Sequence, residues 1–137
     1  MKKEIEAAVN WWVDILKGNP NHDNGESLQS IFANLCARTL KPLSEEKIYT
    51  FRLSLTEGIT KRIEKLGHDP NNPMWGSSLR CFGTDYHPDV VLAEAAEKAE
   101  IDAISLRFPI KTLMWINPGE VTVSRGYGAK SEVIYPS

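Results

Sequence analysis

Apolar residues recur every three or four positions in the first half of the chain, the spacing of one face of an α-helix. The first stripe predicts a helix that ends at Gly18 and Pro20; its members are Ile5, Ala8, Val9, Trp12 and Leu16. After the polar segment NPNHDNGES, a second stripe begins behind the N-cap Ser27 and ends at Pro42. Its members are Leu28, Ile31, Phe32, Leu35, Cys36 and Leu40.

A third helix is predicted to begin at Ser44, which is a good N-cap residue. Glu45 and Glu46 then place negative charge at the positive end of the helix dipole. The helix ends near Gly67, and its stripe consists of Ile48, Phe51, Leu55, Ile59, Ile63 and Leu66. Gly58 lies inside this stripe and lowers its helix propensity.

The second half of the chain mixes helix and strand signals. The segment GHDPNNPMWGSS predicts a loop, and residues 78–84 predict a strand. A helix with Pro88 at its first position follows, and its narrow face consists of Val91, Leu92, Ala95, Ala96 and Ala99.

Short apolar runs near the C-terminus indicate strands. The runs 104–110 and 112–116 precede the turn Asn117-Pro118-Gly119-Glu120. The alternating residues 121–124 follow this turn, which predicts a β-hairpin. Residues 132–135 add an edge strand.

These elements predict an α+β fold in which N-terminal helices pack with a small C-terminal antiparallel sheet. A single domain over residues 1–137 is expected, with a helical part at about 1–67 and a mixed part at about 78–137, because the helix stripes need the sheet to complete a core. The 137 residues are 42% hydrophobic, which excludes a disordered chain. The net charge of −2 excludes a polycation that coats nucleic acid and a DNA mimic that acts by bulk charge.

The expected location is the cytoplasm. No window of about 18 apolar residues could span a bilayer. Glu4 and Glu6 interrupt the N-terminal segment, where a secretory signal would need an apolar run. The two cysteines, Cys36 and Cys81, are too few and too far apart for a disulfide scaffold or a zinc knuckle.

The segment Asp85-Tyr86-His87-Pro88-Asp89 offers two carboxylates and an imidazole just before a helix. In an extended backbone, alternate side chains share one face and can hold a divalent cation. A histidine at this place can also act as a general base. The favoured alternative is structural: Asp85 or His87 caps the helix, and Asp89 lies in its first turn. No cofactor or resident metal is expected.

Charge and aromatic residues indicate a binding surface on the C-terminal hairpin. The residues expected to anchor a partner are Lys111, Trp115, Arg125 and Tyr127. Cations interleaved with aromatic side chains suit both nucleic-acid contacts and protein interfaces. The alternatives are a solvated sheet face for the cations and a β-bulge in which Tyr127 fills the core.

Trp11 and Trp12 are adjacent, so they cannot face the same side of a helix. One is expected in the core and the other partly exposed, where it can contact a second chain. A homo-oligomer is therefore one expected state.

Several stretches together resemble a family of small proteins carried by phages and mobile elements. They are the Trp11-Trp12 pair, the loop Asp23-Asn24-Gly25, residues 83–89, residues 108–115, residues 121–123 and Gly126-Tyr127-Gly128-Ala129. The resemblance implies an inhibitor of host defence, such as an anti-CRISPR protein directed at Cas9, in the cytoplasm of a bacterial host cell. The implied partner is a bacterial defence nuclease or its guide-RNA complex.

Two hypotheses from different classes follow. The first is a phage or mobile-element inhibitor that acts by binding through the hairpin anchors, with Asp85 and Asp89 as second candidates. The alternative is a metal-dependent enzyme that processes nucleotides or RNA. In that enzyme Asp85, His87 and Asp89 would hold an ion or move a proton, while Lys111 and Arg125 would stabilise a phosphoryl oxyanion.

Overall fold

The computed structural model describes residues 1–18, 42–84, 87–102, 108, 111–126 and 130–136. The second predicted helix and most of the run 104–110 lie outside these residues. The elements in chain order are α1 (Lys2–Leu16), α3 (Glu45–Leu66), the 3₁₀ helix η2 (Ser77–Arg80), β1 (Cys81–Thr84), α4 (Val90–Lys98), β2 (Thr112–Asn117), β3 (Glu120–Arg125) and β4 (Glu132–Tyr135). The predicted α+β class is confirmed.

The four strands form one antiparallel sheet in the order β1-β2-β3-β4. The hairpin predicted around Pro118 and Gly119 joins β2 to β3, and Asn117 pairs with Glu120 across the turn. Gly119 has a φ of 81°, a left-handed conformation that glycine adopts without strain. The predicted edge strand is β4, whose pairing with β3 shifts register between Val121 and Thr122.

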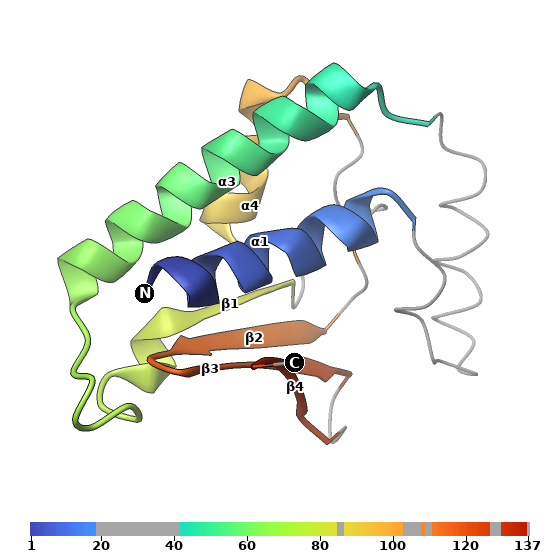
Figure 1. Ribbon diagram of the computed structural model, residues 1–137. Coiled ribbons are helices and arrows are strands. Elements are labelled where there is room, and N and C mark those ends of the chain that lie inside the picture. The colour runs from blue at the N-terminus through green and yellow to red at the C-terminus, as the bar shows by residue number, and fades with distance from the viewer. Residues whose placement is uncertain (19–41, 85–86, 103–107, 109–110, 127–129, 137) are drawn as a thin grey trace.

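Figure 1 shows helix α1 lying between α3 and the sheet, with α4 packed against α3. This position explains the wide apolar surface of α1, because one side contacts α3 and another contacts strands β2, β3 and β4. Among the described residues, no helix is long and apolar enough to cross a membrane.

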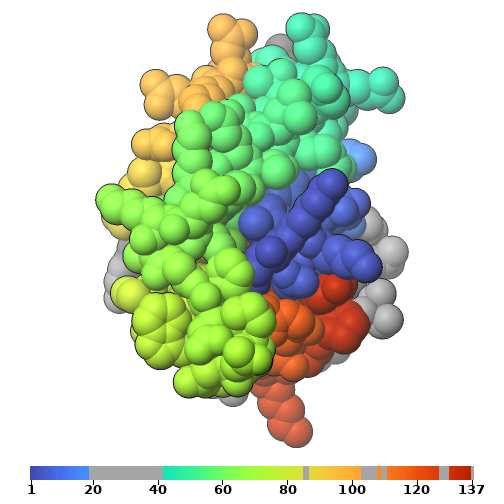
Figure 2. All heavy atoms as spheres, turned by 60° about the vertical axis from the view of Figure 1, so that its left-hand side comes forward, coloured from blue at the N-terminus to red at the C-terminus, as the bar shows by residue number. Residues whose placement is uncertain are grey.

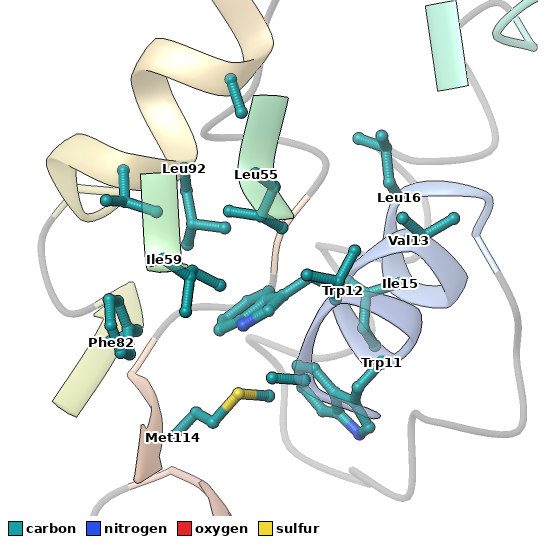
Figure 3. Packing of buried hydrophobic residues seen from close by; sticks show 14 of the residues in the cluster. Trp11, Trp12, Val13, Ile15, Leu16, Leu55, Ile59, Phe82, Leu92 and Met114 are labelled. Carbon is teal, nitrogen blue, oxygen red and sulfur yellow. The ribbon is translucent and has the colours of Figure 1, made fainter. Parts of the chain in front are cut away.

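Trp11 and Trp12 are both buried, which corrects the expectation that one of them is partly exposed. Their side chains are 5% and 0% exposed, and their rings meet edge-on with centroids 4.9 Å apart. Trp12 points into the centre of the core, between Leu55 and Ile59 of α3 and Met114 of β2 (Figure 3). Because α1 is covered on two sides, both tryptophans are buried inside the domain, and neither supports a homo-oligomer.

Helix α3 is continuous through Gly58, as its apolar stripe predicts. The hydroxyl of Ser44 accepts a hydrogen bond from the Lys47 amide at 3.2 Å, so the predicted N-cap is confirmed. Gly58 faces α4, and a methyl group added there would lie 3.6 Å from Val91. The helix ends at Gly67, where φ is 80°.

Two predicted boundaries around β1 are wrong. The strand predicted over 78–84 begins only at Cys81, because residues 77–80 form the 3₁₀ helix η2. Helix α4 begins at Val90, two residues after Pro88. Its N-cap is Asp89, whose carboxylate accepts a hydrogen bond from the Val91 amide at 3.0 Å. The predictions that His87 caps this helix and that Asp89 lies in its first turn are therefore wrong.

Candidate functional site

Three large apolar side chains project into solvent within a six-residue stretch. Met74, Trp75 and Leu79 are 66%, 54% and 59% exposed, and we call them the loop patch. They belong to the segment that joins α3 to β1, seen in yellow-green at the lower edge of Figure 2. Clustered exposed apolar side chains, tryptophan and methionine above all, are typical of protein interfaces.

A series of tight turns positions the loop patch. The carboxylate of Asp69 accepts a hydrogen bond from the Asn71 amide at 2.9 Å, which opens the loop with an Asx turn. The amides of Trp75, Ser77 and Leu79 each bond to a carbonyl three residues earlier, at 3.0 to 3.1 Å. Gly76 supplies the left-handed residue that this path requires, with a φ of 73°.

Arg80 holds this loop from beneath. Its side chain is fully buried, and the guanidinium donates to four oxygens of three different segments. They are the carbonyls of Gly67 (3.1 Å), Pro73 (3.1 Å) and Ile116 (2.8 Å) and the amide oxygen of Asn117 (3.1 Å). The end of α3, the loop and the end of β2 are thereby tied to one group.

The guanidinium of Arg80 is a buried charge whose hydrogen bonds go to uncharged oxygens. No carboxylate among the described residues pairs with it, and burial lowers the pKa of this guanidinium from its ordinary value. Arginine nevertheless stays protonated in proteins. Its four oxygen acceptors replace the water that the charge loses on burial, so the geometry of the loop is set by the directions of the guanidinium N–H groups.

The side chains of the loop patch lie near different elements: the Asn117 side-chain amide at the end of β2 donates to the Met74 sulfur at 3.9 Å, whereas the ring of Trp75 lies near Gly67 at the end of α3. The outer face of the sheet is the face turned away from the helices. Alternation along the strands places one row of side chains there: Cys81, Trp115, Thr122 and Val133. Trp115 is half-buried and lies opposite Cys81 across the β1–β2 pair. Cys81 follows Leu79 of the loop patch by two residues. Burial, and secondarily the negative charge of Asp89, raises the pKa of the Cys81 thiol, so the thiolate is disfavoured.

The other predicted hairpin anchors lie apart from Trp115. Lys111 and Arg125 are brought together at the far end of the hairpin, where the Gly126 amide donates to the Lys111 carbonyl at 3.0 Å. Arg125 forms an ion pair with Glu132 at 2.8 Å, and strand alternation puts it on the helix side of the sheet. Tyr127 lies outside the described residues. A binding role for these residues stays a prediction.

The predicted acid–imidazole cluster is not assembled as a metal site in the described part of the chain. Asp85 lies outside that part, and His87 is exposed. Asp89 is engaged twice, as the N-cap of α4 and in a two-bond ion pair with Arg62 at 2.7 and 3.2 Å. Arg62 also stacks over the ring of Phe82 at 4.7 Å, so Asp89 joins α3, α4 and β1 structurally. No group of three potential metal ligands occurs among the residues described.

Sequence reasoning missed both the loop patch and Arg80. Met74 and Trp75 carried a signal, because large apolar residues are unusual in a segment rich in proline, asparagine and glycine. Arg80 also carried a signal, because it continues, at steps of two residues, the row of inward-facing side chains formed by Phe82 and Thr84. Reading that alternation backwards from Phe82 would have placed an arginine in the core.

The comparisons with known proteins agree on one family. The model of the BTG family matches residues 29–135. The structure is similar to that of the C. elegans FOG-3 BTG/Tob domain, with a TM-score of 0.71 over 98% of this chain and 81% of that chain. The two sequences are 18% identical, so this likeness shows the fold alone. No curated protein matches the chain.

These findings overturn the resemblance to phage and mobile-element proteins and the functions derived from it. A eukaryotic family supports neither an anti-CRISPR inhibitor of Cas9 nor a metal-dependent enzyme that processes nucleotides or RNA. The bacterial defence nuclease expected as a partner is wrong for the same reason. The stretches that carried the resemblance contain no catalytic signature, so they identified no activity. Because residues 29–135, most of this chain, match the family model, the chain belongs to the BTG family.

Proposed function

We propose that this chain is a protein-binding domain that docks a partner through the loop patch. The observation that carries the proposal is the exposure of Met74, Trp75 and Leu79 on a segment whose backbone is fixed by Arg80. A fixed loop loses little conformational entropy on binding, so apolar contacts made there contribute nearly in full. An isolated flexible loop with the same side chains would bind more weakly.

The partner surface that fits is a shallow apolar pocket or groove on another protein. Tryptophan and methionine side chains insert into such pockets and are frequent among the residues that dominate binding energy. Trp115 and Val133 on the outer sheet face offer further apolar contact area for a partner that reaches beyond the loop patch. A partner that covers the loop patch and part of this face would bury both.

The test compares affinity capture by the wild-type chain and by single variants in cells that express it. Trp75→Ala and Leu79→Ser are expected to lose the partners that the wild type retains, because each truncation at the centre of an interface costs about 1–3 kcal/mol. Val90→Ser is the matched control, since Val90 is 63% exposed on another element. Partners retained by Leu79→Ser as fully as by Val90→Ser would refute the proposal.

A further inference from the structure

Met74 has the most exposed side chain of the loop patch, and its sulfur makes a defined polar contact. The side chain is 66% exposed, and the Asn117 side-chain amide donates to the sulfur at 3.9 Å. The chain has two other methionines, Met1 and Met114. Met114 is fully buried, and Met1 is partly buried at the start of α1. An oxidant in solution therefore reaches the sulfur of Met74 more readily than that of Met114.

Hydrogen bonds hold the backbone on both sides of Met74. The Pro73 carbonyl accepts from Arg80, and the Met74 carbonyl accepts from the Ser77 amide, both at 3.1 Å. Asn117 is fixed as well, because it is 3% exposed and its side-chain oxygen accepts from Arg80 at 3.1 Å. Since a guanidinium only donates, this bond assigns the oxygen of Asn117 to Arg80 and leaves the NH₂ group facing the sulfur. The sulfur thus lies beside a fixed N–H donor.

The sulfur of Met74 has two lone pairs, as every thioether does. An oxidant that adds oxygen to one or to the other produces two different epimers of methionine sulfoxide. One lone pair accepts the N–H of Asn117, on the side of the buried arginine network. The other points away from Asn117, and the side chain is mostly exposed. A peroxide that arrives from solvent meets the second lone pair, so the contact with Asn117 selects one epimer.

We propose that Met74 is a reversible oxidation site at which hydrogen peroxide weakens binding by the loop patch. The sulfur gives its solvent-facing electron pair to one peroxide oxygen, the O–O bond breaks, and an S–O bond forms. The sulfur is oxidised by two electrons, and the second oxygen leaves as water. A sulfoxide reductase specific for the resulting epimer returns it to methionine, with electrons from a dithiol and release of water. The effect on binding rests on the proposed function of the loop patch, whereas the selection of one epimer does not.

Oxidation of Met74 changes the polarity of the loop patch. A sulfoxide oxygen accepts hydrogen bonds, whereas a partner pocket that fits methionine is apolar and offers no donor. Binding would bury this oxygen unsatisfied, which is expected to weaken the complex about tenfold. The oxidised chain should keep its fold, because Met74 lies outside the buried core.

The first experiment follows the chemistry on the isolated chain. The folded protein is treated with hydrogen peroxide, and peptide mass spectrometry measures sulfoxide at each methionine. Met74 is expected to be oxidised before Met114. Two classes of sulfoxide reductase exist, each of which accepts one epimer. One of them should reduce nearly all of the Met74 sulfoxide and the other almost none; equal reduction by both would overturn the proposal.

Asn117→Asp is the matched control for the selection of one epimer. Aspartate keeps an oxygen for Arg80 but has no N–H for the sulfur. Each reductase is expected to reduce only part of the Met74 sulfoxide in this variant. The same single epimer as in the wild type would show that Asn117 does not select it, and would overturn the proposal. If the variant does not fold, the wild-type chain oxidised in urea replaces it, and it should give both epimers.

The second experiment measures affinity capture of the partner that the wild type retains and Leu79→Ser loses. Met74→Gln places an uncharged polar group at the sulfur and should weaken capture about tenfold without oxidant. Peroxide-treated wild type should lose capture to the same extent and regain it after treatment with the matching reductase. Met74→Leu has no sulfur at this position, so peroxide should not change its own untreated level. Because Met74→Leu keeps Cys81, it also controls for thiol oxidation.

The outcomes separate the oxidation site from the proposed function. Full capture by Met74→Gln, or by wild type whose Met74 is oxidised, would overturn the effect on binding and leave the proposed function intact. If the reduced wild type captures no partner that Leu79→Ser loses, the proposed function is wrong and the effect on binding is wrong with it. The reductase result decides the selection of one epimer in either case.

Discussion

Replacing Arg80 by methionine tests whether one buried guanidinium holds the loop patch in place. Methionine fills much of the same volume but donates no hydrogen bond, so four oxygens lose their donor. The carbonyls of Gly67 and Pro73 lie in partly buried surroundings and can be rehydrated. The oxygens of Ile116 and Asn117 are bonded to Arg80 in fully buried surroundings, where water does not replace the donor.

The expected loss follows from those two oxygens. An unsatisfied buried acceptor costs about 1–3 kcal/mol, so two of them cost about 4 kcal/mol. Relief from burying the charge offsets part of this, which leaves about 3 kcal/mol. For a domain of this size that corresponds to a fall of about 10 °C in the melting temperature.

Urea unfolding followed by circular dichroism measures the effect. The matched control is Arg52→Met, because Arg52 is half-buried and its one described partner is the side chain of Asn10. The control should lose less than about 1 kcal/mol. An Arg80→Met variant as stable as the Arg52→Met variant would refute the role assigned to the buried guanidinium.

Three further predictions concern α4, α3 and β1. Asp89→Ala removes a cap and an ion pair and should lower the free energy of unfolding by about 2 kcal/mol in urea titrations, whereas Asp89→Asn keeps the cap and should lose about half as much; equal losses would contradict the dual role. Gly58→Ala should raise it by about 0.5–1 kcal/mol, since the new methyl makes an ordinary contact with Val91; a loss would show that α4 cannot accept it. In a Cys36→Ser background, the Cys81 thiol should react with iodoacetamide more slowly than glutathione at pH 8, and an equal rate would contradict its raised pKa. The free energy of unfolding of this variant should also fall as the pH rises above the ordinary thiol pKa, because the unfolded chain releases the Cys81 proton at a lower pH than the folded chain does.

The sequence predicted helices α1 and α3 well because their signals are local. The stripe from Phe51 to Ile63 and the cap at Ser44 lie within one segment, so periodicity alone placed α3. The turn at Pro118 and Gly119 likewise placed the hairpin. The boundary at η2 was missed because it depends on contacts of Arg80 with segments 13 and 36 residues away.

The candidate site was harder to predict because it depends on tertiary contacts between segments that are distant in sequence. One of Trp11 and Trp12 was expected to be partly exposed because one helix alone shows only its own apolar stripe, whereas α1 is covered by both α3 and the sheet and both side chains are buried. For Asp89 the sequence left a metal ligand and a residue at the start of a helix as alternatives, and the ion pair with Arg62, 27 residues away in sequence, is a contact that no local pattern predicts. The loop patch could not be predicted from local pattern either, because the exposure of Trp75 depends on which surfaces the rest of the chain leaves uncovered.

Site-specific photo-crosslinking tests the central claim, protein binding through the loop patch, most directly. A photoreactive phenylalanine analogue is placed at position 79 in one chain and at position 90 in another, and both are illuminated in cells that express them. The account predicts that position 79 captures a defined partner, that Trp75→Ala abolishes this product, and that position 90 does not yield it. The same products from both positions, or a product at position 79 that survives Trp75→Ala, would contradict the claim.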